Sequence, residues 1–590
     1  MEHGVDRTHY CGELSEKAVD SDVVLYGWVK NTRNLGGCIF LDLRDREGIV
    51  QVVFDPADDR SVFEKASGLG REFVIRVTGK VRRRPNPNSK IPTGMVEVVA
   101  TGVEVISRSE VPPIEVEDII TANEETRFRN RVLDLRRRPV QRIFKIRHKA
   151  VQSVRRYLDE QGYMELETPF LARSTPEGAR DFLVPSRKQR GSFYALPQSP
   201  QLFKQLFMAA GFDRYFQVVK CFRDEDLRGE RQPEFTQIDI EASFVEPEDI
   251  YELVDGLISR TWRDAIDAEV DLPLPRMTWQ EAMDRFGSDK PDLRLNGMEI
   301  QDLSDVFKGS GFKVFESVIE DGGVVRGLAA PLAYGWSRKQ VQDLEAVVKE
   351  HGAAGMAWVK LGDDNVTSGP LARFLNRERA EHIRRLAGIG EKPALVCVCA
   401  GKNTVTVPAL GALRLELGKR LGLIERDTYR FAWITDFPLF EWSEEEHDWT
   451  PSHHPFTRPR IEDLALLDEN PGGVRSLAYD IVCNGSEIGG GSIRIHEEDL
   501  QRRIFERLGI SSREAEEKFG FFLRNLKFGT PPHGGVALGM DRITMILTGA
   551  DSIREVIPFP KTTTGQCLLT NAPSRVDERQ FRELGLELLR

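Results

Sequence analysis

The sequence predicts an α+β chain of several domains that begins with a small β-barrel. Its 590 residues, 40% of them hydrophobic, exceed what one compact core holds. Short β-like runs broken by turns fill the first hundred or so residues, whereas apolar residues recur at helical spacing soon afterwards. We therefore expect about three or four domains.

The N-terminal barrel is predicted over residues 1–108. Five apolar runs of strand length lie within it, at 23–25, 39–41, 49–54, 73–77 and 96–100. Five strands fit a barrel of the OB type. Arg33, Phe40 and Gln51 on adjacent strands combine a cation, an aromatic ring and an amide, a mixture that suits the binding of unstacked bases.

The rest of the chain divides where its composition changes. Prolines and acidic residues at 111–118 indicate a hinge, and a predicted helix from Ile143 ends at Gly162 before a strand-like run that ends at Pro169. Beyond the barrel we expect a hinge at 109–140, a core in two parts at 141–285 and 421–558, a Gly- and Ala-rich insert at 286–420, and a C-terminal extension at 559–590.

Composition narrows the possible classes of protein. The formal net charge of −11 argues against coating of nucleic acid through bulk electrostatics, although basic clusters such as 82–84 can contact phosphates. Seven cysteines without a Cys-x-x-Cys pair indicate neither a disulfide framework nor a zinc ribbon. A charged N-terminal stretch and the absence of a long apolar run predict a cytoplasmic protein.

The densest chemical signal is a predicted hairpin formed by 221–226 and 231–239. Arg223 could meet a phosphate bidentately there, and the ring of Phe235 could stack on a purine. A salt-bridged surface hairpin would explain the charges but not the rest of the pattern. The hairpin therefore predicts a nucleotide site.

A second signal is the Gly-rich run at 534–542, which leads into an apolar segment. Glycines let the backbone approach a ligand, and Arg542 at the start of a helix adds its charge to the positive helix end. Neither a P-loop nor a Rossmann fingerprint is present. The run predicts a phosphate site of another kind.

The helix-strand-Pro169 unit, the hairpin and the Gly-rich run, in this order, resemble motifs 1, 2 and 3 of class II aminoacyl-tRNA synthetases. The segments 175–181, 198–205, 235–239 and 489–494 resemble the bacterial aspartyl-tRNA synthetases in particular, and the insert resembles their GAD domain. The resemblance covers essentially the whole chain. It implies an OB-fold barrel, a class II antiparallel-sheet core and an inserted α/β domain.

The resemblance also implies a ligase that activates L-aspartate with ATP and transfers it to the 3′ end of tRNA-Asp. Lys204 and Arg494 match the positions that hold the side-chain carboxylate, and two cations there would reject asparagine. The residues implied to bind aspartate are Glu177, Ser199, Gln201, Lys204, Arg223, Gln237, Asp239, His453 and Arg494.

Nucleotide, metal and RNA positions follow from the same resemblance. Arg223 and Arg542 match the catalytic arginines, Asp480 and Glu487 the acidic pair that binds Mg²⁺, and Arg33, Phe40 and Gln51 the anticodon contacts. The residues implied to bind ATP are Arg223, Asp224, Glu225, Gln232, Phe235, Glu487, Gly539, Met540, Asp541 and Arg542. A homodimer is implied as well.

Two alternatives stay open at this point. An asparaginyl or lysyl synthetase shares the plan of barrel and core, but Lys204 with Arg494 and the GAD-like insert argue against both. A non-catalytic tRNA-binding paralogue is disfavoured because Arg223, Asp480 and Arg542 are present. The sequence leaves undecided whether tRNA-Asn is charged too, and what the insert does.

Overall fold

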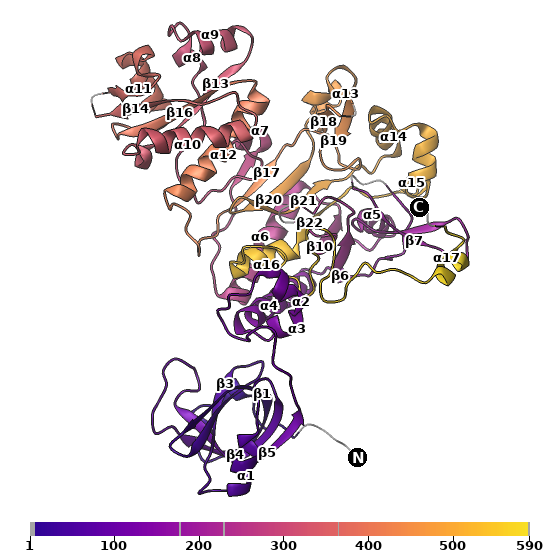
Figure 1. Ribbon diagram of the computed structural model, residues 1–590. Helices are drawn as coiled ribbons and strands as arrows, with labels where there is room; N and C mark the ends of the chain where they lie inside the picture. The colour runs from indigo at the N-terminus through magenta and orange to yellow at the C-terminus, as the bar shows by residue number, and fades with distance from the viewer. Residues whose placement is uncertain (1–5, 176–178, 228–230, 364, 446, 588–590) are drawn as a thin grey trace. The chain divides into compact units, whose positions relative to one another are not determined.

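The computed structural model describes residues 6–175, 179–227, 231–363, 365–445 and 447–587 (Figure 1). Glu177, one of the predicted aspartate-binding residues, lies outside the described residues. The chain forms two compact units. The first consists of residues up to His148 with 227–230 and 552–575, and the second of the remainder.

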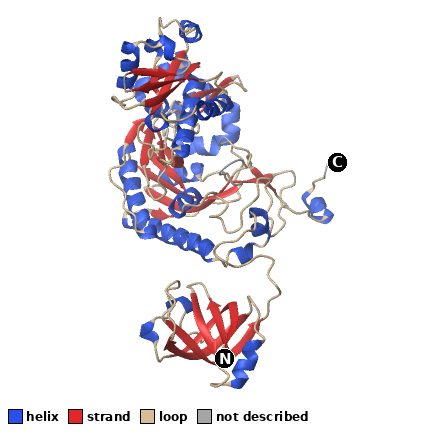
Figure 2. Ribbon diagram, turned by 60° about the vertical axis from the view of Figure 1, so that its left-hand side comes forward, coloured by secondary structure: helices blue, strands red, loops and turns tan. Residues whose placement is uncertain are grey.

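The first unit contains the predicted barrel, whose strands are drawn in red in Figure 2. These strands close in the order β1-β2-β3-β5-β4. Alternate residues of β1 point inward, so that Val23, Leu25 and Val29 join an apolar core inside the barrel. The elements are β1 (Asp22–Leu35), β2 (Cys38–Arg44), β3 (Ile49–Phe54), α1 (Arg60–Ser67), β4 (Val74–Arg83) and β5 (Val96–Ser107). The OB-type barrel is confirmed.

A buried ion cluster fixes the helices that follow the barrel: α2 (Glu124–Arg129), α3 (Arg131–Asp134) and α4 (Arg138–Glu160). The Asp134 carboxylate lies 2.6 Å from Nη1 of Arg131 and 2.7 Å from Nη1 of Arg137. Arg131 also donates to the main-chain oxygens of Ile557 and Pro558. The buried carboxylate is therefore paired, and the returning segment 552–575 is tied to this unit.

The second unit is built on a sheet with the strand order β11-β17-β20-β21-β22-β10-β9-β6 in the described residues. Only the edge pairs β11/β17 and β6/β9 are parallel there, so the predicted antiparallel core is confirmed. The strands are β6 (Met164–Glu165), β9 (Arg214–Phe222), β10 (Glu234–Ser243), β11 (Arg276–Thr278), β17 (Phe431–Thr435), β20 (Ala478–Cys483), β21 (Ser486–Ile493) and β22 (His533–Gly539).

Helices pack against the central strands of this sheet. The helix α5 (Gln201–Ala209) lies on β10, and both α6 (Pro247–Ile266) and α16 (Met540–Thr548) contact β22. A phenylalanine cluster joins α5 to α14 (Glu498–Arg507) and α15 (Ser512–Leu526). The smaller elements are β7 (Phe182–Pro185), β8 (Phe193–Leu196), β18 (Phe440–Ser443), β19 (Asp448–Pro451), α13 (Leu466–Glu469) and α17 (Glu578–Leu584).

The insert is a sheet of order β12-β13-β16-β14-β15 with helices on both faces. On β16, Cys397 and Cys399 face one apolar cluster while Val396 and Val398 face the other, so both cysteines are buried. The helix α7 (Trp279–Phe286) precedes the insert and packs on β17 of the large sheet. The elements of the insert are β12 (Gln301–Asp302), α8 (Ser304–Phe307), α9 (Lys313–Glu320), β13 (Val324–Ala330), α10 (Arg338–Glu350), β14 (Ala357–Gly362), β15 (Asn365–Ser368), α11 (Arg377–Leu386), β16 (Ala394–Gly401) and α12 (Asn403–Arg420).

Candidate active site

Two carboxylates on β10 form the centre of the site. Asp239 and Glu241 are fully buried and share one face of the strand, while Ile238 and Ile240 point to the other face. Nζ of Lys204, on α5, lies 2.8 Å from Oδ1 of Asp239 and 3.2 Å from Oε2 of Glu241. A buried ammonium thus joins both carboxylates.

Arg494 completes a buried charge quartet with Lys204, Asp239 and Glu241. Its Nε and Nη2 donate to the two oxygens of Glu241 at 3.0 and 3.1 Å. Two cations and two anions therefore face one another inside the sheet. Such a group is stable only while every member keeps its partners.

Glycines on neighbouring strands make room for the carboxylates. A Cβ on Gly535, which lies opposite Glu241, would be 2.1 Å from Oε2 of that residue. A Cβ on Gly490 would be 2.2 Å from Oδ1 of Asp480. The glycines of β21 and β22 therefore leave space for acidic side chains to pack against the sheet.

The two carboxylates of the quartet differ in acidity. Burial raises the pKa of Asp239 to about 6, which Lys204 only partly offsets. Burial also acts on Glu241, but Arg494 and Lys204 outweigh it and lower its pKa to about 2. Glu241 is thus a permanent anion that holds the cations, and Asp239 is the group that titrates.

His454 supports Arg494 from the other side. Nη1 of Arg494 donates to Nε2 of His454 at 2.7 Å, so this ring nitrogen presents its lone pair. Nδ1 faces the main-chain N–H of Phe456 and Oγ1 of Thr457, both at 3.3 Å. Burial and the charge of Arg494 lower the pKa of His454 well below its usual value, which keeps the ring neutral.

Two N–H donors of the quartet have no partner among the residues that the structure describes. A guanidinium has five N–H donors, of which Arg494 uses four, on Glu241, His454 and Ser492. An ammonium has three, of which Lys204 uses two. Among the described residues, Oδ2 of Asp239 and Nε2 of Gln201 are buried without a hydrogen-bond partner. The site can therefore accept a carboxylate and a cation together.

The hairpin predicted from the sequence is formed by β9 and β10. Arg223 directly follows β9, and its guanidinium lies over the ring of Phe235, 5.2 Å from the centroid. Nε of Arg223 is buried without a hydrogen-bond partner in the described chain. Gln237 accepts from Sγ of Cys221 at 3.1 Å. Arg223 and Phe235 therefore lie together, as an arginine and a platform for one nucleotide would.

Other predicted nucleotide residues surround this hairpin. Glu225 pairs with Arg231 at 2.9 Å, and the main chain of Asp224 pairs with Arg180. Nε2 of Gln232 donates to the main-chain oxygen of Arg231 at 3.3 Å. These groups lie in the loop end of the hairpin, at the same end of β10 as Phe235.

The end of β22 and the start of α16 provide the second arginine. Gly539 ends the strand, and the side chain of Met540 is buried. Oδ2 of Asp541 accepts from the main-chain N–H of Thr236 at 2.8 Å, which ties α16 to β10. Arg542 donates to the main-chain oxygen of Glu487. This arginine therefore lies beside the predicted acidic pair.

Asp480 and Glu487 lie on the hairpin β20–β21. Oδ1 of Asp480 is 3.2 Å from Nε2 of His453, and Oε2 of Glu487 is 2.8 Å from Nζ of Lys290. Burial and the charge of Glu487 raise the pKa of Asp480. Asp480 in turn raises the pKa of His453 against the opposing effect of burial. Negative charge therefore accumulates at this hairpin.

The donor chemistry of this pair fits Mg²⁺, which binds carboxylate oxygens and completes its shell with water or phosphate. In the part of the chain that the structure describes, no three or more His, Cys, Asp or Glu side chains are grouped to hold a metal ion. Two carboxylates suffice for a metal that is bound together with phosphates.

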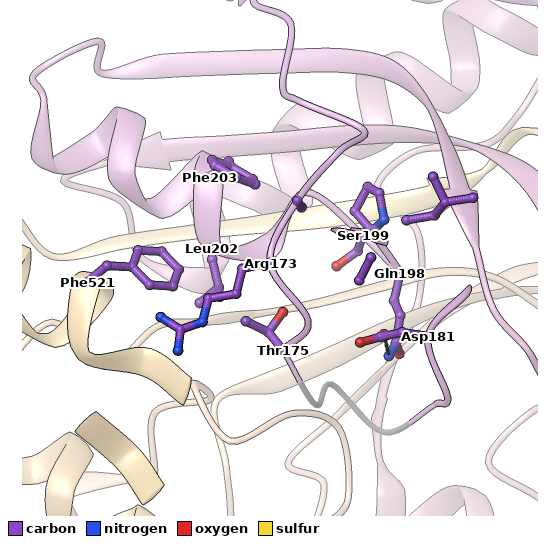
Figure 3. Close-up of a pocket in the computed structure, with 12 residues that line it drawn as sticks. Arg173, Thr175, Asp181, Gln198, Ser199, Leu202, Phe203 and Phe521 are labelled. Carbon is purple, nitrogen blue, oxygen red and sulfur yellow. Dashed lines mark hydrogen bonds between the residues drawn. The ribbon is translucent and has the colours of Figure 1, made fainter. Parts of the chain in front are cut away.

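A pocket lies beside the N-terminal end of α5 (Figure 3). Ser199, one of the predicted aspartate contacts, lines it together with Gln198 and Asp181. Nε2 of Gln198 donates to Oδ1 of Asp181 at 2.6 Å and to the main-chain oxygen of Ala179 at 2.7 Å. The pocket therefore adjoins the quartet through α5, which carries Lys204.

In the barrel, the three predicted base contacts share one face. Arg33 pairs in register with Phe40, and Asp42 with Gln51. Arg33 is exposed, Phe40 is half-buried, and Gln51 is buried with its amide bound to Glu97 at 2.7 Å. The amide oxygen of Gln51 accepts from Arg84 at 2.7 Å and from Arg33 at 3.4 Å, so Gln51 holds both arginines at this face.

Sequence reasoning missed three residues of the site: Glu241, His454 and Lys290. Glu241 could have been found, because the two-residue period of a strand places it on the face of Asp239. His454 directly follows the predicted His453 in the chain, and no sequence pattern connects it with Arg494. Lys290 had no signal, because its partner Glu487 is distant in the chain.

Two family models match the chain. Residues 123–563 match the family model described as tRNA synthetases class II (D, K and N), and residues 23–106 match that of the OB-fold nucleic acid binding domain. The chain belongs to the class II tRNA synthetases. No described helix of this synthetase is long and apolar enough to cross a membrane.

Curated relatives of this class II synthetase are similar along their whole length. It is 51% identical over 586 residues to the aspartate–tRNA(Asp/Asn) ligase of Geotalea uraniireducens, covering 99% of this chain and 98% of that protein. It is 50% identical over 587 residues to the aspartate–tRNA ligase of Clostridium novyi, with the same coverage. The synthetase is therefore an aminoacyl-tRNA ligase.

Solved structures share its fold. The asparaginyl-tRNA synthetase of Pyrococcus horikoshii in complex with asparaginyl-adenylate has a TM-score of 0.59 at 20% identity, covering 95% of this chain and 99% of that one. The aspartyl-tRNA synthetase of Entamoeba histolytica has a TM-score of 0.58 at 19% identity, covering 95% and 92%.

Proposed function

We propose that this enzyme activates L-aspartate with ATP and transfers the aspartyl group to the 3′ end of tRNA-Asp. The observation that carries this proposal is that Lys204 and Arg494 each have one N–H donor without a partner among the described residues. The two oxygens of one carboxylate can accept one donor each. Asparagine would turn its NH₂ group toward one of these donors and lose that bond.

The ammonium of aspartate is assigned to the unpartnered oxygen of Asp239. Oδ2 of this buried carboxylate lacks a partner among the described residues, and such a group is costly unless a ligand satisfies it. Ser199, Gln201, Gln237 and Glu177 are proposed neighbours of the same ligand. The names of the two aspartate–tRNA ligases above support the same substrate.

For ATP, Arg223 is proposed to bind the α-phosphate, Phe235 to stack on adenine and Arg542 to bind the γ-phosphate. Asp480 and Glu487 would hold Mg²⁺, which would neutralise phosphate charge. The aspartate α-carboxylate attacks the α-phosphorus, pyrophosphate leaves, and a terminal ribose hydroxyl of tRNA then displaces AMP. Arg223 and Arg542 promote these steps by positioning and by charge stabilisation.

Amino-acid-dependent ATP–pyrophosphate exchange tests the substrate. We expect exchange with L-aspartate and at least a hundredfold less with L-asparagine or L-lysine, as a site built around charge-assisted bonds discriminates strongly, by about 10⁴ or more. Equal exchange with asparagine would overturn the assignment. Charging of purified tRNA-Asp and tRNA-Asn side by side decides whether the enzyme resembles the Asp/Asn relative.

A homodimer is proposed as the working form. The edge strand β6 and the nearby loop expose Met164, Phe170 and Leu171, an apolar group at the open edge of the sheet. Light scattering after gel filtration should give about twice the chain mass of 66.9 kDa. A mass of one chain at micromolar concentration would contradict this.

A further inference from the structure

Lys290 lies on the segment that joins α7 to the insert, outside every motif found in the sequence. Its Nζ is 2.8 Å from Oε2 of Glu487, and its side chain is 40% exposed. Asp480 and Asp289 also act electrostatically on this ammonium. Lys290 is therefore a cation beside the acidic hairpin, and its side chain can change conformation without disturbing a packed core.

Buried contacts from the insert fix the position of this segment. Arg414 of α12 is almost fully buried and donates to the main-chain oxygens of Asp292 and Leu295, at 3.1 and 2.6 Å. The carboxylate of Asp292 binds Arg294 at 2.7 Å. The insert thereby holds the backbone two residues beyond Lys290.

The same segment packs on the turn between β20 and β21. Nη2 of Arg294 approaches the main-chain oxygen of Asn484 at 3.5 Å, and a Cβ on Gly485 would lie 3.3 Å from Cβ of Asp292. Asp480 and Glu487 flank this turn on the two strands. The segment that carries Lys290 therefore contacts both the insert and the acidic hairpin.

Electrostatics determine which anion the Lys290 ammonium binds when Glu487 binds a divalent cation instead. Glu487 lies between Lys290 and Arg542, which binds its main-chain oxygen. A carboxylate oxygen that binds a divalent cation no longer holds an ammonium as tightly, and the cation repels that ammonium. The polyphosphate of a nucleotide bound at this hairpin is then the nearest strong anion for the flexible Lys290 side chain.

We propose that Lys290 is a ligand of the β- and γ-phosphates of ATP, placed by the insert opposite Arg542. The inference rests on the proposed function, which puts the nucleotide and its metal at Asp480 and Glu487. It gives the insert a role in nucleotide binding. Lys290 and Arg542 would hold the polyphosphate from two sides of Glu487 while pyrophosphate forms.

Binding of ATP, ADP and AMP to the Lys290→Met variant, with Mg²⁺ present, tests the proposal. We expect ATP affinity to fall about tenfold, because one charge-assisted bond is lost, while AMP affinity stays unchanged. Lys290→Arg should keep ATP affinity within about threefold of the wild type. Lys339→Met, at an exposed lysine of α10 in the same insert, is the matched control.

Exchange kinetics provide a second readout. In Lys290→Met the KM values for ATP and pyrophosphate should rise about tenfold, while the KM for L-aspartate stays unchanged. The proposal is overturned if ATP binds the variant as tightly as the wild type. It is also overturned if ATP and AMP affinities fall equally, since the loss would then not concern the β- and γ-phosphates, which AMP lacks.

The wild-type enzyme and Glu487→Gln separate this inference from the proposed function. No aspartate-dependent exchange by the wild type would refute the function itself. Exchange that Glu487→Gln loses and Lys290→Met keeps at wild-type KM values would refute only the role of Lys290.

Discussion

Glu241 is the residue on which the geometry of both cations depends. Its oxygens bind Arg494 at 3.0 Å and Lys204 at 3.2 Å, and all three side chains are buried. Removing a buried anion leaves two buried cations short of negative charge. Under the proposed function, specificity for a dicarboxylic amino acid would depend on a carboxylate that the substrate need not touch.

Replacing Glu241 by Gln should lower the free energy of unfolding by about 3 kcal/mol, because a buried ion network is broken. The KM for L-aspartate should rise about tenfold or more, since Arg494 is no longer held bidentately. Chemical denaturation and exchange kinetics measure the two effects. Glu252→Gln, at an exposed position of α6, should change neither; an unchanged KM in Glu241→Gln would contradict the role.

The pKa of Asp239 near 6 predicts a pH dependence of substrate binding. Burial raises this pKa, so the carboxylate becomes protonated and loses its charge as pH falls through 6. If only the ionised form binds the ammonium, affinity for L-aspartate should be about fourfold lower at pH 5.5 than at pH 8. Calorimetric titration across this range measures it.

His453, whose pKa is raised by Asp480, also titrates near the site. Asp239→Asn removes one group and keeps the other. A pH profile that persists unchanged in this variant would assign the dependence to His453 instead.

At the scale of elements, β22 can occupy its place only because it carries glycine opposite Glu241. A Cβ on Gly535 would lie 2.1 Å from both Oε2 of Glu241 and the main-chain oxygen of Ile240. Backbone cannot yield as a side chain does, so Gly535→Ala should cost about 2 kcal/mol of stability and impair aspartate binding. Thermal unfolding and KM measure this. Gly335→Ala, where the added carbon meets open space, is the control.

Some elements of the fold could be predicted from the sequence and others could not. The five barrel strands, the β9–β10 hairpin and the β22–α16 junction were predicted because each has a local signature of period, turn or glycine. The strands and helices inside the insert were not predicted, since its Gly- and Ala-rich sequence carries no chemical motif. Residue pairs such as Lys290–Glu487 join distant parts of the chain, and no local pattern encodes such contacts.

For the site, prediction reached those residues that lie in contiguous motifs. Lys204, Asp239 and Arg494 were each named from short segments, and the structure places them in one quartet. How their charges are balanced depended on Glu241 and His454, which become partners of Arg494 only through folding. The roles of the individual residues in binding remain proposals.

At the scale of the molecule, the division into two units separates two tests. Phe40 lies in the barrel, whose core is its own, whereas Lys204 and Arg494 lie in the other unit. Phe40→Ala should raise the KM for tRNA about tenfold, the effect of losing one stacked base, and leave aspartate-dependent exchange unchanged. Arg60→Ala, at an exposed position of α1, should alter neither. A loss of exchange in Phe40→Ala would contradict this separation.

The contact of Arg131 with Ile557 and Pro558 has a consequence for biosynthesis. This guanidinium is buried, yet its carbonyl acceptors lie 426 and 427 residues further along the chain. The barrel can close on the ribosome with its own residues, whereas the helices after it must wait for the C-terminal segment before their arginine is satisfied. Ribosome-bound nascent chains that stop short of residue 555 should therefore carry a folded barrel and unfinished helices behind it.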